Sequence, residues 1–119
     1  MNREELQARI RKFGVRTIRL VDTLPRSKSA GVIGKQLLRS ATSIGANYTA
    51  ACRGRSRADF VSKRGIALEE ADESLYWLEM LVESGIVAKK RVADLVDEGR
   101  QLVAILFASS RTARSNLKS

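Results

Sequence analysis

Apolar residues recur at steps of three and four along four stretches of this chain, the spacing of one face of an α-helix. In the first stretch the stripe comprises Leu6, Ile10, Phe13, Thr17, Leu20, Val21 and Leu24. Asn2 is a good N-cap for it, and Pro25 ends it because the residue before a proline avoids the α region. We therefore predict a helix from about residue 3 to residue 23, followed by a loop.

Three further helices are predicted by the same spacing. They span about residues 32–53, 57–83 and 89–110, with Gly54 and Gly85 at the breaks and Ser56 as an N-cap. Their stripes are Ile33, Leu37, Ala41, Ile44, Tyr48 and Ala51; then Phe60, Ala67, Ala71, Ser74, Leu78 and Leu81; then Val92, Leu95, Val96, Leu102, Val103 and Leu106.

The connections between these segments are short, and no strand-like alternation appears. This pattern predicts an all-α fold, an up-down-up-down four-helix bundle. Residues 1–119 are expected to form one domain, with residues 113–119 a frayed basic tail.

Some apolar and small residues exceed what one bundle core requires. Val15 and Ile18 fall outside the first stripe, either as tolerated surface residues or as a second contact surface for self-association. Small residues crowd the middle of the second helix, where Gly45 and Ala46 would let another helix approach closely.

Composition places the chain among ordinary globular proteins, with 44% hydrophobic and 29% charged residues. Cys52 is alone and cannot form an internal disulfide. No apolar run approaches the length of a membrane helix, and the N-terminus is too charged for a signal peptide. We expect a cytoplasmic protein without a membrane partner.

The net charge of +9 is unevenly distributed along the sequence. Residues 1–68 hold 15 basic and 4 acidic side chains, whereas residues 69–119 hold 7 basic and 9 acidic ones. A basic half can attract a polyphosphate or an acidic membrane surface, or form half of a charge-matched subunit contact.

The sequence offers little for catalysis. Histidine, the commonest general base and metal ligand, is absent, and Cys52 has no base to activate it. The acidic run 69–73 lacks the Glu-x-x-His pairs of di-metal bundles. We predict no enzyme activity, metal or cofactor.

Glu70 is the carboxylate that the spacing places within the apolar face of the third helix. A buried carboxylate without a partner is costly. We predict a structural polar network around Glu70, with Arg39, Ser40, Asn47 or Lys63 as candidate partners.

Two groups of cations are candidate nucleic-acid-binding sites. The first-helix patch comprises Arg9, Lys12, Arg16 and Arg19. The loop patch comprises Arg53, Arg55 and Arg57, with Lys63 and Arg64 as candidate additional members. Rows of Lys and Arg at helical spacing can follow phosphates, whereas few aromatics are free to stack on bases. Binding should therefore depend on charge and shape, with little sequence specificity.

The run LLRSATSIGANYTAACRGRSRADFVSKRGIALEEADESLYWLEML, residues 37–81, resembles the 23S rRNA intervening-sequence proteins. The resemblance rests on Arg39-Ser40, on residues 43–48, on Asp59-Phe60, and on residues 67–78. One departure is Ala50, where many relatives carry an acidic residue.

The resemblance implies a four-helix bundle that assembles into a ring-like homopentamer. It also implies similarity to the accessory variability protein of diversity-generating retroelements, a basic pentamer that binds nucleic acid and partners a reverse transcriptase. The leading hypothesis is a non-enzymatic, homo-oligomeric protein that binds RNA or DNA through its basic patches. The alternative is a scaffold for an acidic protein, such as a reverse transcriptase or another polymerase subunit.

Overall fold

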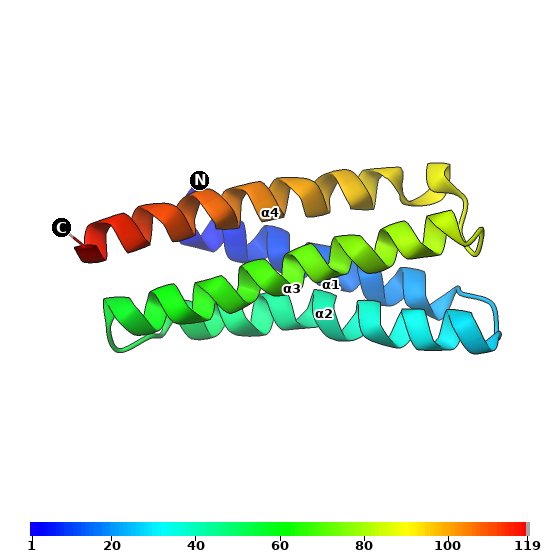
Figure 1. The fold of residues 1–119 in the computed structure, drawn as a ribbon, viewed down its shortest axis with the longest axis horizontal. Helices are drawn as coiled ribbons and strands as arrows, with labels where there is room; N and C mark the ends of the chain where they lie inside the picture. Colours follow the sequence, from blue (N-terminus) through cyan, green and yellow to red (C-terminus); the bar gives the residue numbers. More distant parts are fainter. Residues whose placement is uncertain (119) are drawn as a thin grey trace.

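The computed structural model describes the backbone of residues 1–118 and the side chains of residues 1–108. Its four helices are α1 (Arg3–Asp22), α2 (Lys28–Cys52), α3 (Arg57–Glu83) and α4 (Lys89–Lys118). They run alternately in opposite directions, side by side, in a rod of 50 × 21 × 21 Å (Figure 1). The prediction of an all-α four-helix bundle is confirmed.

Side chains at the helix starts explain most of the boundaries. The Asn2 side chain accepts a hydrogen bond from the Glu5 amide at 2.8 Å, and Ser56 accepts one from the Asp59 amide at 3.1 Å. The second helix begins at Lys28, four residues before the predicted start, because Ser27 caps it. The fourth helix continues to Lys118, beyond its predicted end near residue 110. The side chains of the predicted tail, residues 113–119, lie outside the described part of the chain.

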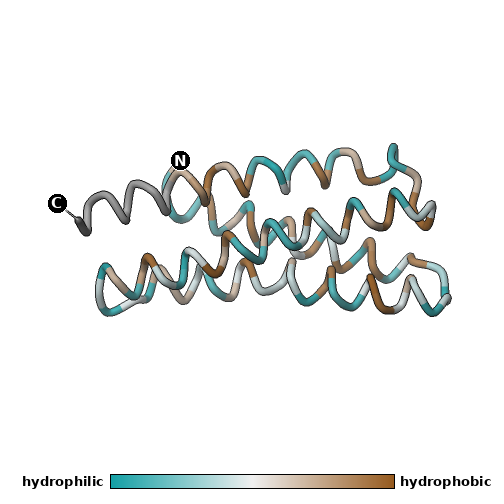
Figure 2. Tube along the Cα trace, viewed as in Figure 1, coloured by the Kyte–Doolittle hydropathy of each residue, from teal (hydrophilic) through white to brown (hydrophobic). Residues whose placement is uncertain are grey.

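The core lies between the four helices, and hydrophobic segments recur along each of them (Figure 2). Its largest fully buried side chains include Ile10, Phe13, Leu37, Ile44, Tyr48, Leu78, Leu81, Leu102 and Leu106. Thr17 is equally buried, and its hydroxyl donates to the Phe13 carbonyl at 2.9 Å, which satisfies the one polar group that it adds to the core.

The four sides of the bundle are packed to different extents. The α2–α3 pairing is the most extensive, and the α1–α4 pairing is by far the smallest. Ser40 and Ser74 lie fully buried between α2 and α3, with their hydroxyls 3.0 Å apart. These small side chains allow α2 and α3 to approach closely, as the sequence predicted for the second helix.

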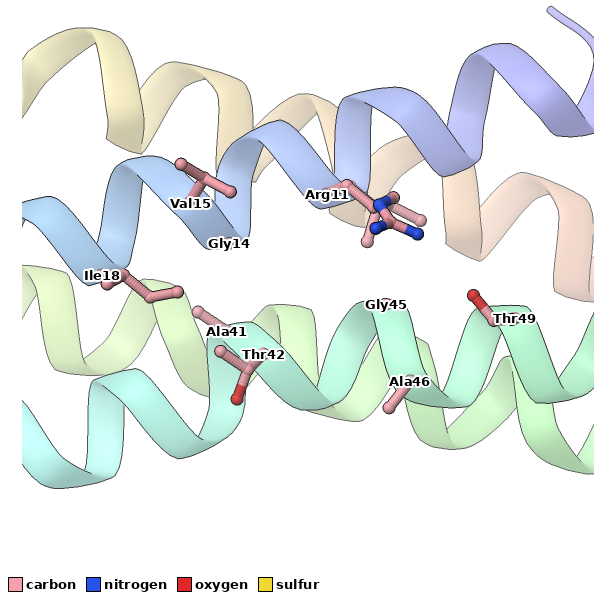
Figure 3. A pocket seen from close by; sticks show the side chains of 10 residues that line it. Arg11, Gly14, Val15, Ile18, Ala41, Thr42, Gly45, Ala46 and Thr49 are labelled. Carbon is pink, nitrogen blue, oxygen red and sulfur yellow. The ribbon is translucent and has the colours of Figure 1, made fainter.

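Two other small residues of α2, Gly45 and Ala46, line a shallow groove of about 370 Å³ between α1 and α2. Its lining includes Gly14, Val15, Ile18, Ala41, Gly45 and Ala46 (Figure 3). Val15 and Ile18 are 46% and 40% exposed, so their apolar surface is not covered within the subunit. We call this feature the α1–α2 groove.

Candidate nucleic-acid interface

Arg9 of the first-helix patch is engaged within the bundle. Its Nε and Nη2 atoms donate to the two carboxylate oxygens of Glu98 on α4, at 3.0 and 2.5 Å. Nη2 also donates to Gln101 at 2.9 Å, and the Glu98 hydrogen bonds raise the pKa of Arg9. Arg9 therefore forms an ion pair that joins α1 to α4, and Glu98 already neutralises its charge in the free protein. Helical spacing alone did not indicate this partner, and the role of Arg9 in nucleic-acid binding stays a prediction.

The rest of the first-helix patch remains at the surface. Lys12 and Arg19 are exposed, and Arg16 is half-buried. Arg16 and Arg19 border a shallow hollow between α1 and α4, to which α4 contributes Arg91. Arg91 donates to the Thr23 hydroxyl, which holds it beside the end of α1. Arg91 is a cation that the helical spacing could not assign to this patch, because it comes from another helix.

The loop patch lies at the end of the bundle where α2 turns into α3, the end at which α1 begins (Figure 1). Arg53, Arg55 and Arg57 are all exposed. The Arg53 backbone caps the end of α2 by donating to carbonyls of its last turn. Arg57 is the first residue of α3, so the positive end of the α3 dipole adds to these three charges. Within the described residues, none of the three forms an ion pair.

Two further arginines gather behind the loop patch around Phe60. The guanidinium carbon of Arg3, at the start of α1, lies 4.7 Å from the ring centroid, and that of Arg64 lies at the same distance. Arg64 is only 6% exposed, and its Nη2 donates to the Tyr48 hydroxyl at 3.0 Å. The structure thus concentrates five arginines near one end of the bundle.

Arg64 occupies a position that the helical spacing could have identified. It follows Phe60 by four residues and precedes Ala67 by three, so it lies on the centre of the α3 stripe. Its Nε atom is buried without a hydrogen-bond partner among the described residues. A buried cation flanked by two aromatic rings, rather than by a carboxylate, is the least expected polar feature of this core.

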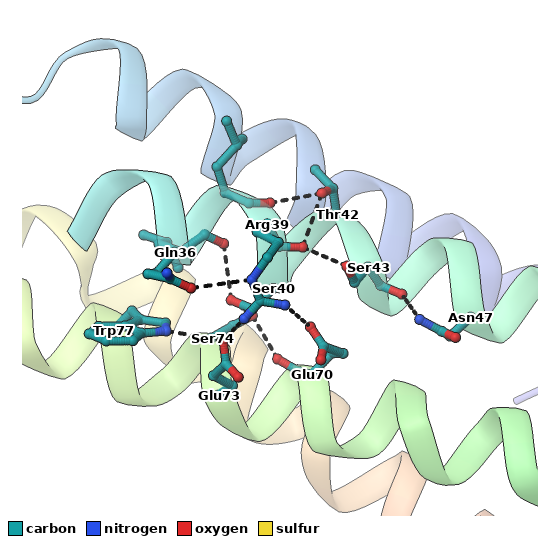
Figure 4. A network of polar contacts seen from close by, with 12 residues as sticks. Gln36, Arg39, Ser40, Thr42, Ser43, Asn47, Glu70, Glu73, Ser74 and Trp77 are labelled. Atoms are coloured by element: carbon teal, nitrogen blue, oxygen red, sulfur yellow. Dashed lines mark hydrogen bonds and ion pairs between the residues drawn. The ribbon is translucent and has the colours of Figure 1, made fainter. Parts of the chain in front are cut away.

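The predicted polar network exists only in part (Figure 4). Arg39 donates to Glu70 at 3.1 Å and also pairs with Glu73, which accepts from the Trp77 indole nitrogen at 3.2 Å. The Glu70 side chain is 17% exposed and lies at the edge of the α2–α3 contact, not at its buried centre.

The other members of the predicted network bond elsewhere. Ser40 pairs with Ser74, and Asn47 donates to the Ser43 carbonyl at 2.9 Å within its own helix. Lys63 has no described contact with Glu70. Of the four candidate partners of Glu70, the structure selects Arg39.

Glu70→Gln should therefore lower the free energy of unfolding only slightly, by at most about 1 kcal/mol. The reason is that Arg39 is half exposed and keeps Glu73 as a second carboxylate partner. Urea denaturation of the two proteins measures the difference. A loss of several kcal/mol would show instead that Glu70 is buried in solution.

The buried Tyr48 hydroxyl should make the folded protein less stable at alkaline pH. Burial raises the pKa of the Tyr48 hydroxyl from its ordinary value near 10.0, while the charge of Arg64 opposes this rise. The folded protein therefore holds this proton to higher pH than the unfolded chain does, and stability is complete below about pH 10 and falls above it. Tyr48→Phe should lose less stability than the wild type between about pH 8 and about pH 10.5. Equal alkaline losses in the urea midpoints of both proteins would contradict this assignment.

The described residues offer neither a metal site nor a membrane-spanning helix. No three His, Cys, Asp or Glu side chains lie together in a way that could hold a metal ion. No helix in that part of the chain combines the length and hydropathy needed to cross a membrane. The cationic patches are the charged features that stand out.

Comparison with known proteins assigns this arrangement to a family. The family model described as 23S rRNA-intervening sequence protein matches residues 4–108. A crystal structure of a protein of unknown function, from the S23 ribosomal protein family of Bacteroides thetaiotaomicron, superposes with a TM-score of 0.86. The two chains are 33% identical, and the match covers 93% of this chain and 99% of the other. No curated protein matches the chain significantly.

Proposed function

This chain belongs to the 23S rRNA-intervening sequence protein family, and we propose that it is a non-enzymatic, cytoplasmic accessory protein that binds RNA or DNA as a homo-oligomer. The observation that carries the proposal is the loop patch. Arg53, Arg55 and Arg57 extend from one end of a rigid bundle, and no carboxylate among the described residues pairs with them. Free cations of this kind neutralise phosphates and release counterions.

The same geometry supports low sequence specificity. The aromatic ring nearest the loop patch, that of Phe60, is already stacked against Arg3 and Arg64. Tyr48 is buried in the core, so it has no face free for a base. We therefore expect backbone recognition, with RNA tested first because the family is named for an rRNA sequence.

Assembly would strengthen this binding. The first-helix patch runs along α1 from its middle toward its C-terminal end, whereas the loop patch lies at one end of a rod 50 Å long, so the two patches are separate surfaces of one subunit. A ring of subunits, with the pentamer that the family resemblance suggests as the expected form, would repeat each patch around its axis. Weak contacts at each patch would then act together on one polyanion.

Binding is tested with a labelled single-stranded RNA lacking secondary structure, titrated at increasing salt concentrations. The triple variant Arg53→Glu, Arg55→Glu, Arg57→Glu should bind at least tenfold more weakly than the wild type at low salt. Losing three phosphate contacts should also reduce the slope of log affinity against log salt by about 2.

A matched variant controls for the change in net charge. Lys28→Glu, Lys89→Glu, Lys90→Glu removes three exposed cations at the other end of the bundle and changes the net charge equally. It should retain most of the affinity. Equal losses in the two variants would mean that total charge, and not the loop patch, determines binding.

The scaffold hypothesis makes a different prediction for the same protein. An acidic protein partner, such as a polymerase subunit, would remain bound after nuclease treatment of a pull-down. A wild-type protein that ignores RNA and DNA at low salt, yet retains such a partner, would replace the proposed function with that alternative.

A further inference from the structure

Two uncovered surfaces of this bundle are opposite in charge. The first is the α1–α2 groove, whose floor is formed by Gly14, Ala41 and Gly45 and whose wall carries the exposed Val15 and Ile18. A β-carbon added at Gly14 would find its nearest neighbour, the Ala41 carbonyl oxygen, at 3.8 Å. Because the side chains here are so small, a helix from outside can approach the backbone closely.

The helices that form the groove are basic. The sequence of α2 contains no acidic residue, and the acidic residues of α1 are confined to its ends, at Glu4, Glu5 and Asp22. Arg11 lines the groove, as do Thr42 and Thr49 of α2. Lys35 precedes Thr42 by seven residues, or two helical turns, so it lies on the same face of α2. An occupant with apolar and acidic side chains would fit both the shape and the charge.

The second surface is the outer face of α3, which has that composition. Between residues 62 and 83 its exposed residues recur at steps of three and four and form one stripe. The stripe contains no cation. Its apolar members are Ile66 and Tyr76, which are 37% and 53% exposed, and its acidic members are Glu69, Asp72, Glu79 and Glu83. We call it the acidic α3 stripe.

The charges of the acidic α3 stripe are largely available. Glu79 lies 4.0 Å from Arg100, and both side chains of this loose pair are about half exposed or more. No other ion pair of the described residues involves a member of the stripe. The stripe also does not cover the groove of its own subunit, because the helices packed alongside α3 are α2 and α4, whereas α1 meets α3 only where Arg3 lies over Phe60.

We propose that the acidic α3 stripe of one subunit docks in the α1–α2 groove of a second copy, with Tyr76 as the apolar anchor. This inference rests on the proposed function, because it names the contact that holds the proposed homo-oligomer together. The two surfaces differ, so the contact is heterologous: each subunit uses its groove for one neighbour and its stripe for the other. Such contacts build a ring when the rotation between subunits closes.

The occupant is a second copy because this chain supplies the complementary charge itself. The excess of cations in residues 1–68 lies partly along the groove helices, and the excess of acids in residues 69–119 lies partly on the stripe. Aromatic side chains such as Tyr76 are enriched at interface centres. Tyr76 makes an edge-to-face contact with Trp77 of its own subunit and still leaves 53% of its surface exposed for a partner.

The experiment uses two single variants of the full chain and their mixture. Ala46→Glu puts an acidic side chain into the groove, and Tyr76→Lys removes the anchor of the stripe and adds a cation. Both positions are exposed, so both variants should fold, which circular dichroism checks. By light scattering after size exclusion, each variant alone should be a monomer under conditions where the wild type is an oligomer.

The mixture identifies the contact. The Tyr76→Lys protein retains an intact groove and the Ala46→Glu protein retains an intact stripe, so an equimolar mixture should form a species of two subunits, one of each. Ala93→Glu makes the same substitution at an exposed position of α4 and should leave the wild-type assembly unchanged.

Each other outcome has a distinct meaning. Variants that remain assembled like the wild type, or a mixture that stays monomeric, would overturn the inference and leave the proposed RNA binding and assembly intact. A wild-type protein that is itself monomeric would overturn both this inference and the proposed homo-oligomer.

Discussion

Arg64→Ala is expected to lower the free energy of unfolding by about 3 kcal/mol. The side chain is 6% exposed and fills the space between the rings of Tyr48 and Phe60, so alanine leaves a cavity there. The substitution also removes the guanidinium that donates to the buried Tyr48 hydroxyl, which then loses a partner. Thermal and urea denaturation measure the loss. The proteins are compared at the same concentration, because assembly would shift the midpoints of both transitions.

Arg64→Met separates the shape of this side chain from its charge. Methionine keeps a long apolar side chain between the rings and removes a cation that has no carboxylate partner among the described residues. Replacing a buried charge by an apolar group of similar volume is often neutral, so we expect a change within about 1 kcal/mol. If methionine costs as much as alanine, the guanidinium itself stabilises the site through its ring contacts and its hydrogen bond.

Gly99→Leu should be the second strongly destabilising change, costing about 3 kcal/mol. Gly99 is buried on α4 where that helix passes over Phe13 and Leu75. A β-carbon there would lie 2.9 Å from Leu75 Cδ2 and 3.2 Å from Phe13 Cε1, and the rest of a leucine would displace both side chains. The urea midpoint should fall well below that of the wild type.

The matched control places the same residue at a glycine with free space. Gly31 lies in the first turn of α2, and a β-carbon added there would meet no atom within 4 Å. Gly31→Leu should leave stability unchanged or raise it by about 0.5 kcal/mol, because glycine is a poor helix former. Similar losses at both positions would mean that helix propensity, not the close approach at Gly99, governs the result.

The helices were predictable because their periodicity and caps agree. Asn2 and Ser56 cap α1 and α3 as their sequence positions indicate, and the apolar stripes form the core. The start of α2 was not predictable in the same way. Residues 28–31 show no apolar period, so Ser27, a residue type that favours the N-cap position, is the one local signal that marks this start.

The cationic residues of the candidate site could be predicted from the sequence, but their partners on other helices could not. The cations of the first-helix patch and the loop patch are where their helices place them, at the surface or half-buried. Spacing along one helix contains no information on the register between α1 and α4, however, so it could not show that Glu98 pairs with Arg9 or that Arg91 joins Arg16 and Arg19. Periodicity locates a residue on its own helix, whereas the partner on another helix depends on how far the two slide past each other.

Glu70 and Arg64 illustrate a second limit. The apolar face of α3 is wide, so its centre could be drawn through either residue from spacing alone. The structure puts Arg64 inside and Glu70 at the edge. Residues of α2 explain why Arg64 is buried and Glu70 is not. Tyr48 accepts a hydrogen bond from the buried Arg64, and Arg39 donates one to Glu70 at the edge of the α2–α3 contact.

The sparse side of the bundle has a consequence for its dynamics. Helix α1 meets α4 through few contacts, and the Arg9–Glu98 pair is the described ion pair that joins them. Native-state hydrogen exchange should therefore release the amides of α1 sooner than those of α2 and α3, whose shared contact is the largest. If α1 detaches from the bundle at a lower free-energy cost than the other helices, it could also complete the bundle of a neighbouring subunit. That would make α1 the natural element for domain swapping in this fold.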